Sequence, residues 1–230
     1  MDVWLSLPFL PAEDLRRLTV AAEAAGVTGL ALSDHVCVPA AFESPYPYAA
    51  PGKPAALPPG TEMPDPLITV AALAGLAPRL RFMTAVLVAP LRHPVALAKQ
   101  VATTAAMTGN RFDLGVGAGW LREEFEALGF HTFKVRGRVL DEMLPLLREL
   151  WTGEPVAHTG DHFTFEAVAV NPAPVRPVPI LIGGHSDAAL ARCARFGDGW
   201  VGVSPGVDEL ESIGRRLAAA RAAAGTADRP

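Results

Sequence analysis

The sequence predicts an α/β fold in which a parallel sheet is covered by helices. Six short apolar runs alternate along the chain with segments whose apolar residues recur at helical spacing. Each run is continuously hydrophobic, which is typical of a strand that is buried on both faces of a parallel sheet. Two architectures satisfy this order of elements: a β/α barrel and an open, doubly wound sheet.

The length and composition favour one globular domain over residues 1–230. Half of the residues are hydrophobic and 19% are charged, so the chain can form one sizeable core. The net charge is only -4 and no run of Lys and Arg is present, which argues against a nucleic-acid partner. No apolar run reaches about 18 residues, so neither a signal peptide nor a membrane helix is expected. The two cysteines, Cys37 and Cys193, are too few for a disulfide framework, and we expect a cytoplasmic protein.

The chain begins with a strand–helix–strand unit, and the later elements continue this rhythm. Residues 3–7 and 28–32 are the first two strands, and the helix between them is expected over 11–26. The second strand leads directly into Ser33-Asp34-His35. The remaining elements are expected as helix 65–77, strand 80–88, helix 94–107, strand 111–116, helices 123–128 and 135–150, strand 178–182, helix 187–196 capped by Ser186, strand 199–203 and helix 208–224.

Two segments depart from this rhythm. Residues 39–64 contain eight prolines, which exclude a regular helix. A loop of this length inside a compact domain is usually functional, and Phe42, Tyr46 and Tyr48 favour a lid or a wall of a substrate pocket. The alternative is a merely mobile insert. Residues 158–170 alternate apolar and polar side chains around a Gly-Asp turn, which predicts a small hairpin.

Unusual residues follow four of the predicted strands, at the edge where ligands bind in both architectures. A histidine in such a place can exchange a proton near neutral pH, and glycines there let a flat or anionic ligand approach the backbone N–H groups. The alternatives are a histidine that only bonds to a loop, and glycine turns that hold no ligand. The four segments are Asp34-His35, Ala85-Val86, Gly117-Ala118-Gly119-Trp120 and Gly183-Gly184-His185-Ser186.

The common nucleotide and metal motifs are not matched. The glycines at 115–119 have the spacing Gly-x-Gly-x-Gly, which differs from the dinucleotide fingerprint Gly-x-Gly-x-x-Gly. The chain contains neither a Walker lysine motif nor a Gly-x-Ser-x-Gly elbow. No two histidines have metal-ligand spacing on one element, so no metal site is expected.

The motifs taken together resemble those of a known family. The stretch 111–120, read Arg-Phe-Asp-Leu-Gly-Val-Gly-Ala-Gly-Trp and followed by Glu124-Phe125 and Leu128-Gly129, resembles the signature of luciferase-like oxidoreductases. The closer match is to the branch that uses the deazaflavin coenzyme F420. Further matching motifs occur in the same order along nearly the whole chain: Ser33-Asp34-His35, Leu91-Arg92-His93-Pro94, Asp141-Glu142-Met143-Leu144, Leu150-Trp151, Ile182-Gly183-Gly184 and Gly197-Asp198-Gly199-Trp200.

The resemblance implies a (β/α)8 barrel of the TIM-barrel type, of which this chain holds about six of the eight strands. It implies a deazaflavin or flavin ring at the carboxyl ends of the strands, with a non-prolyl cis peptide at Ala85-Val86 against the ring. His35 matches the catalytic histidine, and Asp34 lies beside it near the cofactor. The cofactor-binding positions that it implies are Asp34, Ala85, Val86, Gly117, Ala118, Gly119, Gly183, Gly184, His185 and Ser186.

The function that the resemblance implies is hydride transfer between F420 and a small organic substrate. Ala118 occupies a place where flavin-using luciferases tend to carry a basic residue for the FMN phosphate, which favours F420. Trp120, Tyr46 and Tyr48 are expected at the substrate pocket, and Trp120 replaces a glutamate that donates a proton in some sugar-phosphate dehydrogenases. The alternatives are an FMN-dependent monooxygenase that uses O₂, and a non-catalytic flavin-binding relative. A homodimer is expected to cover the gap left by the missing strands.

Overall fold

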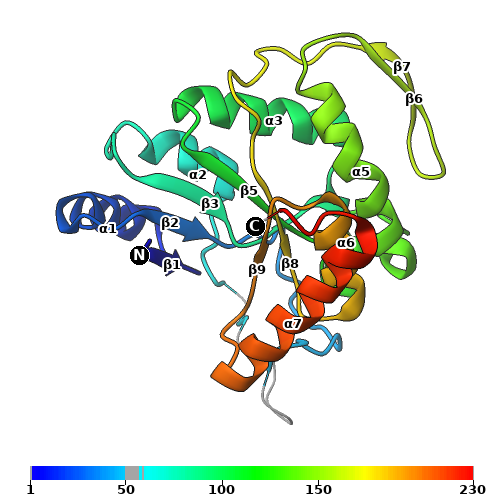
Figure 1. The fold of residues 1–230 in the computed structure, drawn as a ribbon. Coiled ribbons are helices and arrows are strands. Elements are labelled where there is room, and N and C mark those ends of the chain that lie inside the picture. The colour runs from blue at the N-terminus through cyan, green and yellow to red at the C-terminus, as the bar shows by residue number, and fades with distance from the viewer. Residues whose placement is uncertain (1, 50–56, 59, 230) are drawn as a thin grey trace.

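The computed structural model describes residues 2–49, 57–58 and 60–229, and its centre is a curled parallel sheet (Figure 1). The spatial order of the strands is β1-β2-β3-β5-β8-β9, and β4 pairs with β5 beyond the end of β3. The six strands on this path form a half-barrel, so the predicted incomplete barrel is confirmed. The strands are β1 (Trp4–Leu7), β2 (Gly29–Leu32), β3 (Arg81–Thr84), β4 (Leu87–Val88), β5 (Phe112–Gly117), β8 (Ile180–Gly183) and β9 (Gly199–Val201).

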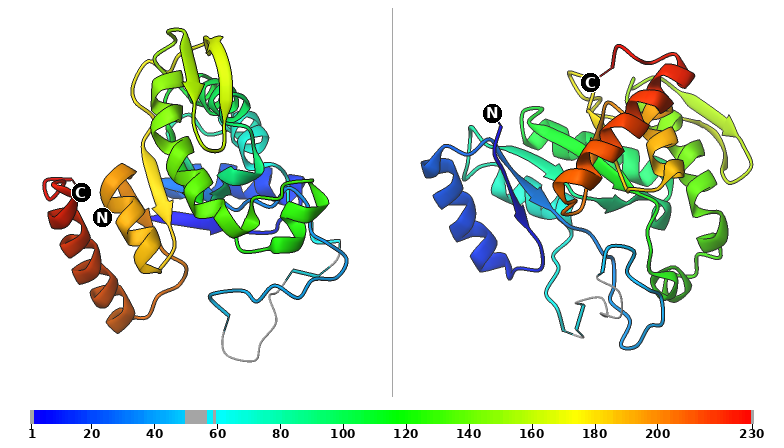
Figure 2. Two further views of the ribbon diagram at one scale, coloured as in Figure 1. Left: turned by 90° about the vertical axis from the view of Figure 1, so that its right-hand side faces the viewer. Right: turned by 60° about the horizontal axis from the view of Figure 1, so that its bottom comes forward.

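Helices connect the strands and cover the sheet, as expected for successive βα units. Figures 1 and 2 place the first and last helices at opposite sides of the molecule. The helices are α1 (Ala12–Ala25), α2 (Pro66–Leu73), α3 (Pro94–Met107), α4 (Arg122–Ala127), α5 (Arg136–Leu150), α6 (Asp187–Phe196) and α7 (Val207–Ala224), with short 3-10 turns at Ala89–Leu91 and Phe133–Val135.

Individual capping residues that are visible in the sequence set the ends of several helices. Gly26 adopts a left-handed conformation and ends α1, and the Ser186 hydroxyl caps α6 by accepting a hydrogen bond from the Ala189 N–H at 3.2 Å. The carboxylate of Asp65 caps α2 by accepting from two backbone N–H groups. The helix predicted over 65–77 is nevertheless too long, since α2 ends at Leu73. Gly75 lowers the helical propensity beyond that point, and turns follow.

The third strand is interrupted where a single run was predicted over 80–88. β3 ends at Thr84, whose hydroxyl donates a hydrogen bond to the carbonyl of Gly115 at 2.6 Å. The chain then leaves the ladder for two residues and returns as β4. The peptide bond between Ala85 and Val86 is cis, so this expectation is confirmed. The interruption could not be predicted from the unbroken apolar run, because hydrophobicity indicates which residues are buried and not which residues pair with a neighbouring strand.

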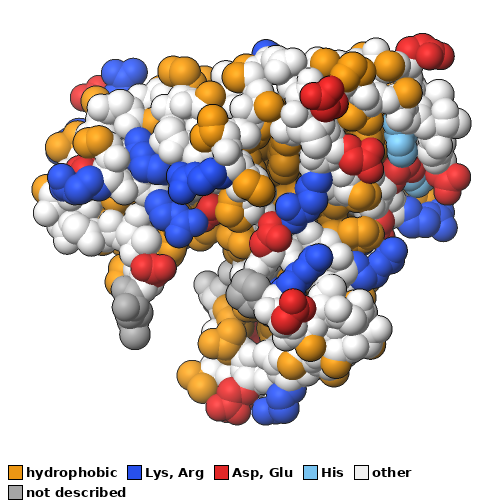
Figure 3. All heavy atoms as spheres, turned by 45° about the horizontal axis from the view of Figure 1, so that its top comes forward, with side chains coloured by type: hydrophobic (Ala, Val, Ile, Leu, Met, Phe, Trp, Pro, Cys, Tyr) orange, Lys and Arg blue, Asp and Glu red, His pale blue; other side chains and the backbone are white. Residues whose placement is uncertain are grey.

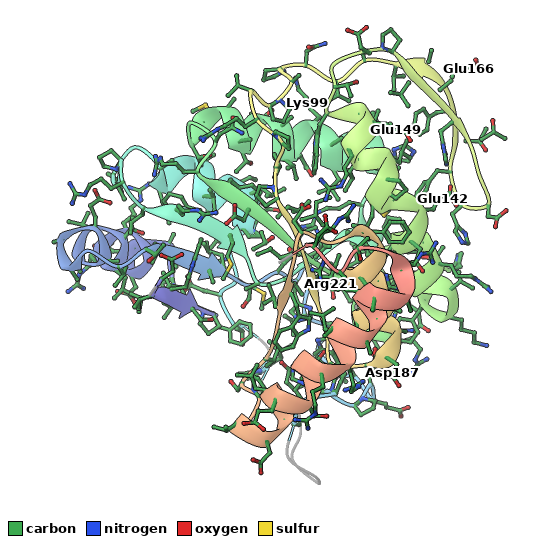
Figure 4. The ribbon with its side chains drawn as sticks, viewed as in Figure 1. Lys99, Glu142, Glu149, Glu166, Asp187 and Arg221 are labelled. Carbon is green, nitrogen blue, oxygen red and sulfur yellow. The ribbon has the colours of Figure 1, made fainter. Side chains whose placement is uncertain are left out.

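The predicted hairpin forms a separate two-stranded sheet of β6 (Val156–Thr159) and β7 (Thr164–Val168). One carboxylate on α5 holds it to the body of the molecule. Glu142 bonds Nε2 of His158 at 2.9 Å and accepts from the N–H groups of His162 and Phe163 at 3.0 Å. Burial raises the pKa of Glu142, but these hydrogen bonds outweigh burial and lower it. Figure 4 shows Glu142 on α5 on the side of the hairpin, which carries Glu166.

The core lies between the sheet and its helices. Among its fully buried side chains are Phe82, Phe112 and Leu114. Figure 3 looks onto the top of the molecule as drawn in Figure 1, and hydrophobic side chains gather there in a hollow near the middle of the face. No helix in the described part of the chain is long and apolar enough to cross a membrane.

Candidate functional site

The sheet brings the ends of β2, β4, β5 and β8 to one rim. Val88 of β4 is paired with Gly117, and Val116 is paired with Ile182 of β8. The carboxylate of Asp34, just after β2, accepts a hydrogen bond from the N–H of Val88 at 2.8 Å. All four segments singled out from the sequence therefore lie close together along the carboxyl ends of the strands.

His35 is held by a buried carboxylate. Its Nδ1 lies 2.8 Å from Oε2 of Glu124, whose side chain is 1% exposed. Oε1 of Glu124 accepts from the N–H groups of Val36 at 2.6 Å and Cys37 at 3.3 Å. A carboxylate partner places a proton on Nδ1 and leaves Nε2 available. Within the described part of the chain Nε2 of His35 has no hydrogen-bond partner, so this atom can exchange a proton with a bound molecule.

Glu124 belongs to the first turn of α4, where the helix dipole favours a negative charge. Reasoning from the sequence did not single it out as a site residue. The available signal was the acidic pair Glu123-Glu124 at the start of a predicted helix, directly after the glycines. The sequence could not show that one member of this pair is buried against a histidine 89 residues earlier in the chain.

Asp34 forms a buried ion pair with Arg92. The two nitrogens of the guanidinium donate to the two carboxylate oxygens at 2.8 and 2.9 Å. Burial lowers the pKa of Arg92, but the hydrogen bonds and charge of Asp34 outweigh burial, and the pKa is raised. Both oxygens of Asp34 are thus engaged by Arg92, and one of them also accepts from the N–H of Val88 at the end of β4. This geometry gives Asp34 a positioning role at the rim, and Arg92 is a second residue that the sequence reasoning did not single out.

The rim glycines make room for protein side chains. A methyl group on Gly117 would lie 2.8 Å from Cγ2 of Val86, and one on Gly183 would lie 2.7 Å from Cγ1 of the same valine. Gly119, at φ +86°, faces Val88 and Phe125. Glycine is therefore required at these positions by the neighbouring valines and Phe125, and the place of these glycines beside a ligand stays a prediction. Ala118 also packs against the hydrophobic core.

The segment after β8 is largely engaged within the protein. Nε2 of His185 accepts a hydrogen bond from the N–H of Val203 at 3.0 Å, and Nδ1 lies 2.8 Å from Oε1 of Glu209. The N–H of Gly184 donates to the carbonyl of Val201 at 3.4 Å. The guanidinium of Arg216 on α7 donates to the carbonyl of His185 at 3.0 Å and pairs with the carboxylate of Asp187 at 2.6 Å.

Residues 42–48, which we call the aromatic strap, run across the rim. Trp120 contacts the rings of Tyr46 at 5.1 Å and His35 at 5.8 Å between centroids. Tyr46 contacts Tyr48 at 5.5 Å, and Tyr48 contacts His185 at 4.7 Å. These rings form a continuous row from the end of β5 to the end of β8. Part of the predicted insert, residues 50–56 and 59, lies outside the described residues.

The strap is attached to the start of α4 by Glu123. One of its oxygens accepts hydrogen bonds from the N–H groups of Glu43 at 2.9 Å and Ser44 at 3.2 Å. The Ser44 hydroxyl in turn accepts from the N–H of Arg122 at 3.1 Å. Burial raises the pKa of Glu123, but the hydrogen bonds from the strap and the charge of Arg122 outweigh it and lower the pKa to about 2.

A cleft of about 430 Å³ lies between the strap and the start of α5. Four strap residues between 43 and 47 form one wall, and Trp120, Arg122, Phe133 and Arg136 form the other. Of the three residues expected at the substrate pocket, Trp120 lines this cleft, while Tyr46 and Tyr48 lie in the row of rings beside it. In the described part of the chain, no group of three His, Cys, Asp or Glu side chains could hold a metal ion.

Proteins of similar sequence include F420-dependent enzymes. An uncharacterized protein of Mycobacterium tuberculosis is 38% identical over 208 residues, which is 90% of this chain and 71% of the relative. An F420-dependent glucose-6-phosphate dehydrogenase of Nakamurella multipartita is 32% identical over 224 residues, which is 91% of this chain and 61% of that protein. The chain thus spans about two thirds of the length of these relatives.

Solved structures of low sequence identity share the fold. An F420-dependent secondary alcohol dehydrogenase in complex with an F420-acetone adduct has a TM-score of 0.79 and 19% identity, covering 97% of this chain and 64% of that one. A type II Baeyer-Villiger monooxygenase of Pseudomonas putida in complex with FMN has a TM-score of 0.75 and 17% identity, covering 98% and 63%.

The family itself is identified by a sequence model. The model for luciferase-like monooxygenases matches residues 3–230, which is nearly the whole chain. The half-barrel agrees with this match. The chain belongs to the luciferase-like monooxygenase family.

Proposed function

We propose that this chain is an F420-dependent oxidoreductase that transfers a hydride between the deazaflavin and a small organic substrate. The observation that carries the proposal is the pairing of His35 with Glu124. It fixes the imidazole and leaves Nε2 without a partner in the described part of the chain, at the strand ends where we propose that the cofactor binds. His35 would give a proton to the substrate or take one from it at Nε2, while Glu124 keeps the proton on Nδ1.

The residues at the rim fit a flat, anionic cofactor. The Ser186 cap lies after β8 at the start of α6, where a helix N-terminus favours an anionic group, and Arg216 of α7, which pairs with Asp187, donates to the nearby carbonyl of His185. Gly183, Gly184, His185 and Ser186 would hold the phosphate, and residues 85–86 and 117–119 would border the ring. The deazaflavin supplies the hydride acceptor or donor, and the protein supplies binding, orientation and proton exchange.

Two findings favour F420 over FMN. Ala118 is small and apolar and provides no charge for an FMN phosphate. A 32% identical relative is named as F420-dependent, whereas the FMN complex is found only at 17% identity. Because Trp120 cannot donate a proton, we propose a substrate other than a sugar phosphate.

The alternative is an FMN-dependent monooxygenase that uses O₂, and the name of the family model supports it. Titrating the purified chain with F420 and with FMN, followed by fluorescence, discriminates the two. We expect saturable binding of F420 and weaker binding of FMN. Tight FMN binding with substrate-dependent O₂ uptake would contradict the proposal. Binding of neither would favour a non-catalytic relative.

Replacing the histidine tests the proton-transfer role. His35→Ala should lower kcat about 100-fold or more and leave the cofactor dissociation constant nearly unchanged. His131→Ala, at an exposed histidine, is the matched control and should have normal kcat. Parallel losses of activity and cofactor affinity in His35→Ala would show that the histidine serves binding instead.

A further inference from the structure

The cleft beside Trp120 has the lining of a small-molecule site. Its volume of about 430 Å³ falls within the range of roughly 300–1,000 Å³ that is usual for such sites. Trp120 and Phe133 provide flat apolar surface, and two prolines of the strap face them. A molecule with a flat, apolar body would bury its surface against these side chains.

Arg136 gives the cleft a fixed positive charge. Its Nε donates to the carbonyl of Gly119 at 2.8 Å and its Nη1 donates to the carbonyl of Phe133 at 2.8 Å. The guanidinium also lies 4.1 Å from the centre of the Phe133 ring. Burial lowers the pKa of Arg136, yet an arginine remains charged at neutral pH. The side chain is therefore held in place before any ligand arrives.

This charge lacks an acidic partner in the part of the chain that the structure describes. Arg136 forms no ion pair there, and its Nη2 donates no hydrogen bond. Charged groups that leave water are ordinarily paired. An immobilised guanidinium with one unused nitrogen at a cleft is suited to a carboxylate, which accepts strong hydrogen bonds from it.

The other charged side chains at the cleft do not change the preference for an anion that Arg136 gives it. Arg122 is already paired with Glu123 and Glu126, each at 3.1 Å. Glu43 is exposed, so water screens its carboxylate strongly. Arg136 is consequently the charged group whose interactions a bound molecule would complete.

We propose that this cleft binds a small organic anion, with a flat apolar body between Trp120 and Phe133 and a carboxylate at Nη2 of Arg136. Trp120 also contacts the ring of His35 at 5.8 Å between centroids, so this one side chain lies between the cleft and the histidine assigned to proton exchange. If the oxidoreductase function proposed above holds, on which this last step rests, the substrate is a carboxylate-bearing molecule of this kind.

The experiment compares two probes of equal shape on the full chain without any cofactor. 4-(Trifluoromethyl)benzoate carries the charge, and 4-(trifluoromethyl)benzamide is its neutral counterpart. Binding is measured from the ¹⁹F line width. We expect the benzoate to bind at least about 10-fold more tightly, as a charge-assisted hydrogen bond would give. Equal affinities for the two probes would overturn the proposal.

Variants then assign the preference to one side chain. Arg136→Gln should abolish the preference for benzoate, whereas Arg138→Gln, the matched control at an exposed arginine of the same helix outside the cleft lining, should keep it within about 2-fold. Glu43→Gln should strengthen benzoate binding slightly, by less than about 3-fold. Retention of the preference in a folded Arg136→Gln protein would contradict the proposal, and so would loss of benzoate binding in Glu43→Gln.

Arg136 also donates hydrogen bonds to two backbone carbonyls, so its replacement could disturb the local fold. A second variant therefore keeps Arg136. Pro47→Trp should fill the cleft from the strap and remove binding of both probes, with the thermal midpoint unchanged; unchanged binding would argue against this cleft. Because these binding experiments use no cofactor, their outcome for the anion site does not depend on whether the oxidoreductase function is correct. A chain that prefers benzoate but binds neither F420 nor FMN would retain the anion site and lose the oxidoreductase assignment.

Discussion

The carboxylate of Glu124 is almost inaccessible to water, and this buried charge fixes the orientation of His35. Oε2 bonds Nδ1 of His35, and Oε1 accepts from the N–H groups of Val36 and Cys37. The aspartate that the sequence singled out, Asp34, is instead bound to Arg92 on both oxygens. The residue that orients the imidazole is therefore the distant glutamate and not the sequence neighbour.

Replacing Glu124 should weaken catalysis through the imidazole. In Glu124→Gln the amide no longer fixes the proton on Nδ1, and we expect kcat to fall about 10- to 100-fold and its pH profile to shift. The cofactor dissociation constant should change less than about 2-fold. Steady-state kinetics over pH and a fluorescence titration measure the two quantities. An unshifted pH profile would mean that Glu124 contributes only to folding.

The Asp34–Arg92 pair should be important for stability. Arg92→Gln leaves a buried carboxylate without its cation, and we expect the free energy of unfolding to fall by about 3–5 kcal/mol. Urea unfolding measures this change. Arg17→Gln, at an exposed ion pair of 3.8 Å, is the control and should change stability by less than about 0.5 kcal/mol. A loss of stability below about 0.5 kcal/mol in Arg92→Gln would contradict the stabilising role of the Asp34–Arg92 pair.

At the scale of elements, the strap depends on α4 through one ionised side chain. The pKa of Glu123 is about 2 in the folded chain and near 4.5 as a reference. A depressed folded pKa stabilises the fold above the reference pKa, and this contribution is lost as the pH falls toward 2. The stability difference between the natural chain and Glu123→Gln should be largest at pH 6 and should shrink below pH 4.5.

Chemical unfolding at several pH values measures this difference. Glu126→Gln is the control, because Glu126 is 54% exposed and pairs only with Arg122 on the same helix. Its effect should remain small at every pH. A Glu123→Gln effect that is equal at pH 6 and pH 3 would mean that the strap is held without help from the charge.

Local chemistry predicted the elements better than it predicted their interruptions. Gly26 and Ser186 define helix ends because their effects are confined to a few neighbouring residues. The split between β3 and β4 depends on how three strands meet, which a run of apolar letters does not encode. For the same reason Glu124, Arg92 and Arg136 escaped prediction, since their partners lie 89, 58 and 17 residues away.

At the scale of the whole molecule, the sheet ends in two edge strands. β1 and β9 each have one neighbour among the described strands, and Val3 and Leu5 near the first edge are 47% and 37% exposed. Such edges invite pairing with another chain. The incomplete barrel was predictable because motifs of the family occur in order along the chain, whereas the homodimer expected at these edges stays a prediction, because no sequence motif reports an interface.

We expect the chain to form a homodimer, or to have reduced thermal stability as a monomer. Sedimentation velocity over a range of concentrations gives the mass, and calorimetry gives the thermal midpoint. A dimer that dissociates on adding a charge at the edge, as in Leu5→Lys, would support pairing at β1. A monomer with a high thermal midpoint would contradict the expectation.

The packing of Val86 between Gly117 and Gly183 restricts which amino-acid substitutions this rim can accept. The valine occupies the volume that side chains on the two glycines would need. Gly117→Ala should therefore be tolerated poorly alone and better together with Val86→Ala. The three positions share one fixed volume, so their sizes should vary in a correlated way among related chains, and libraries that randomise one position should vary all three.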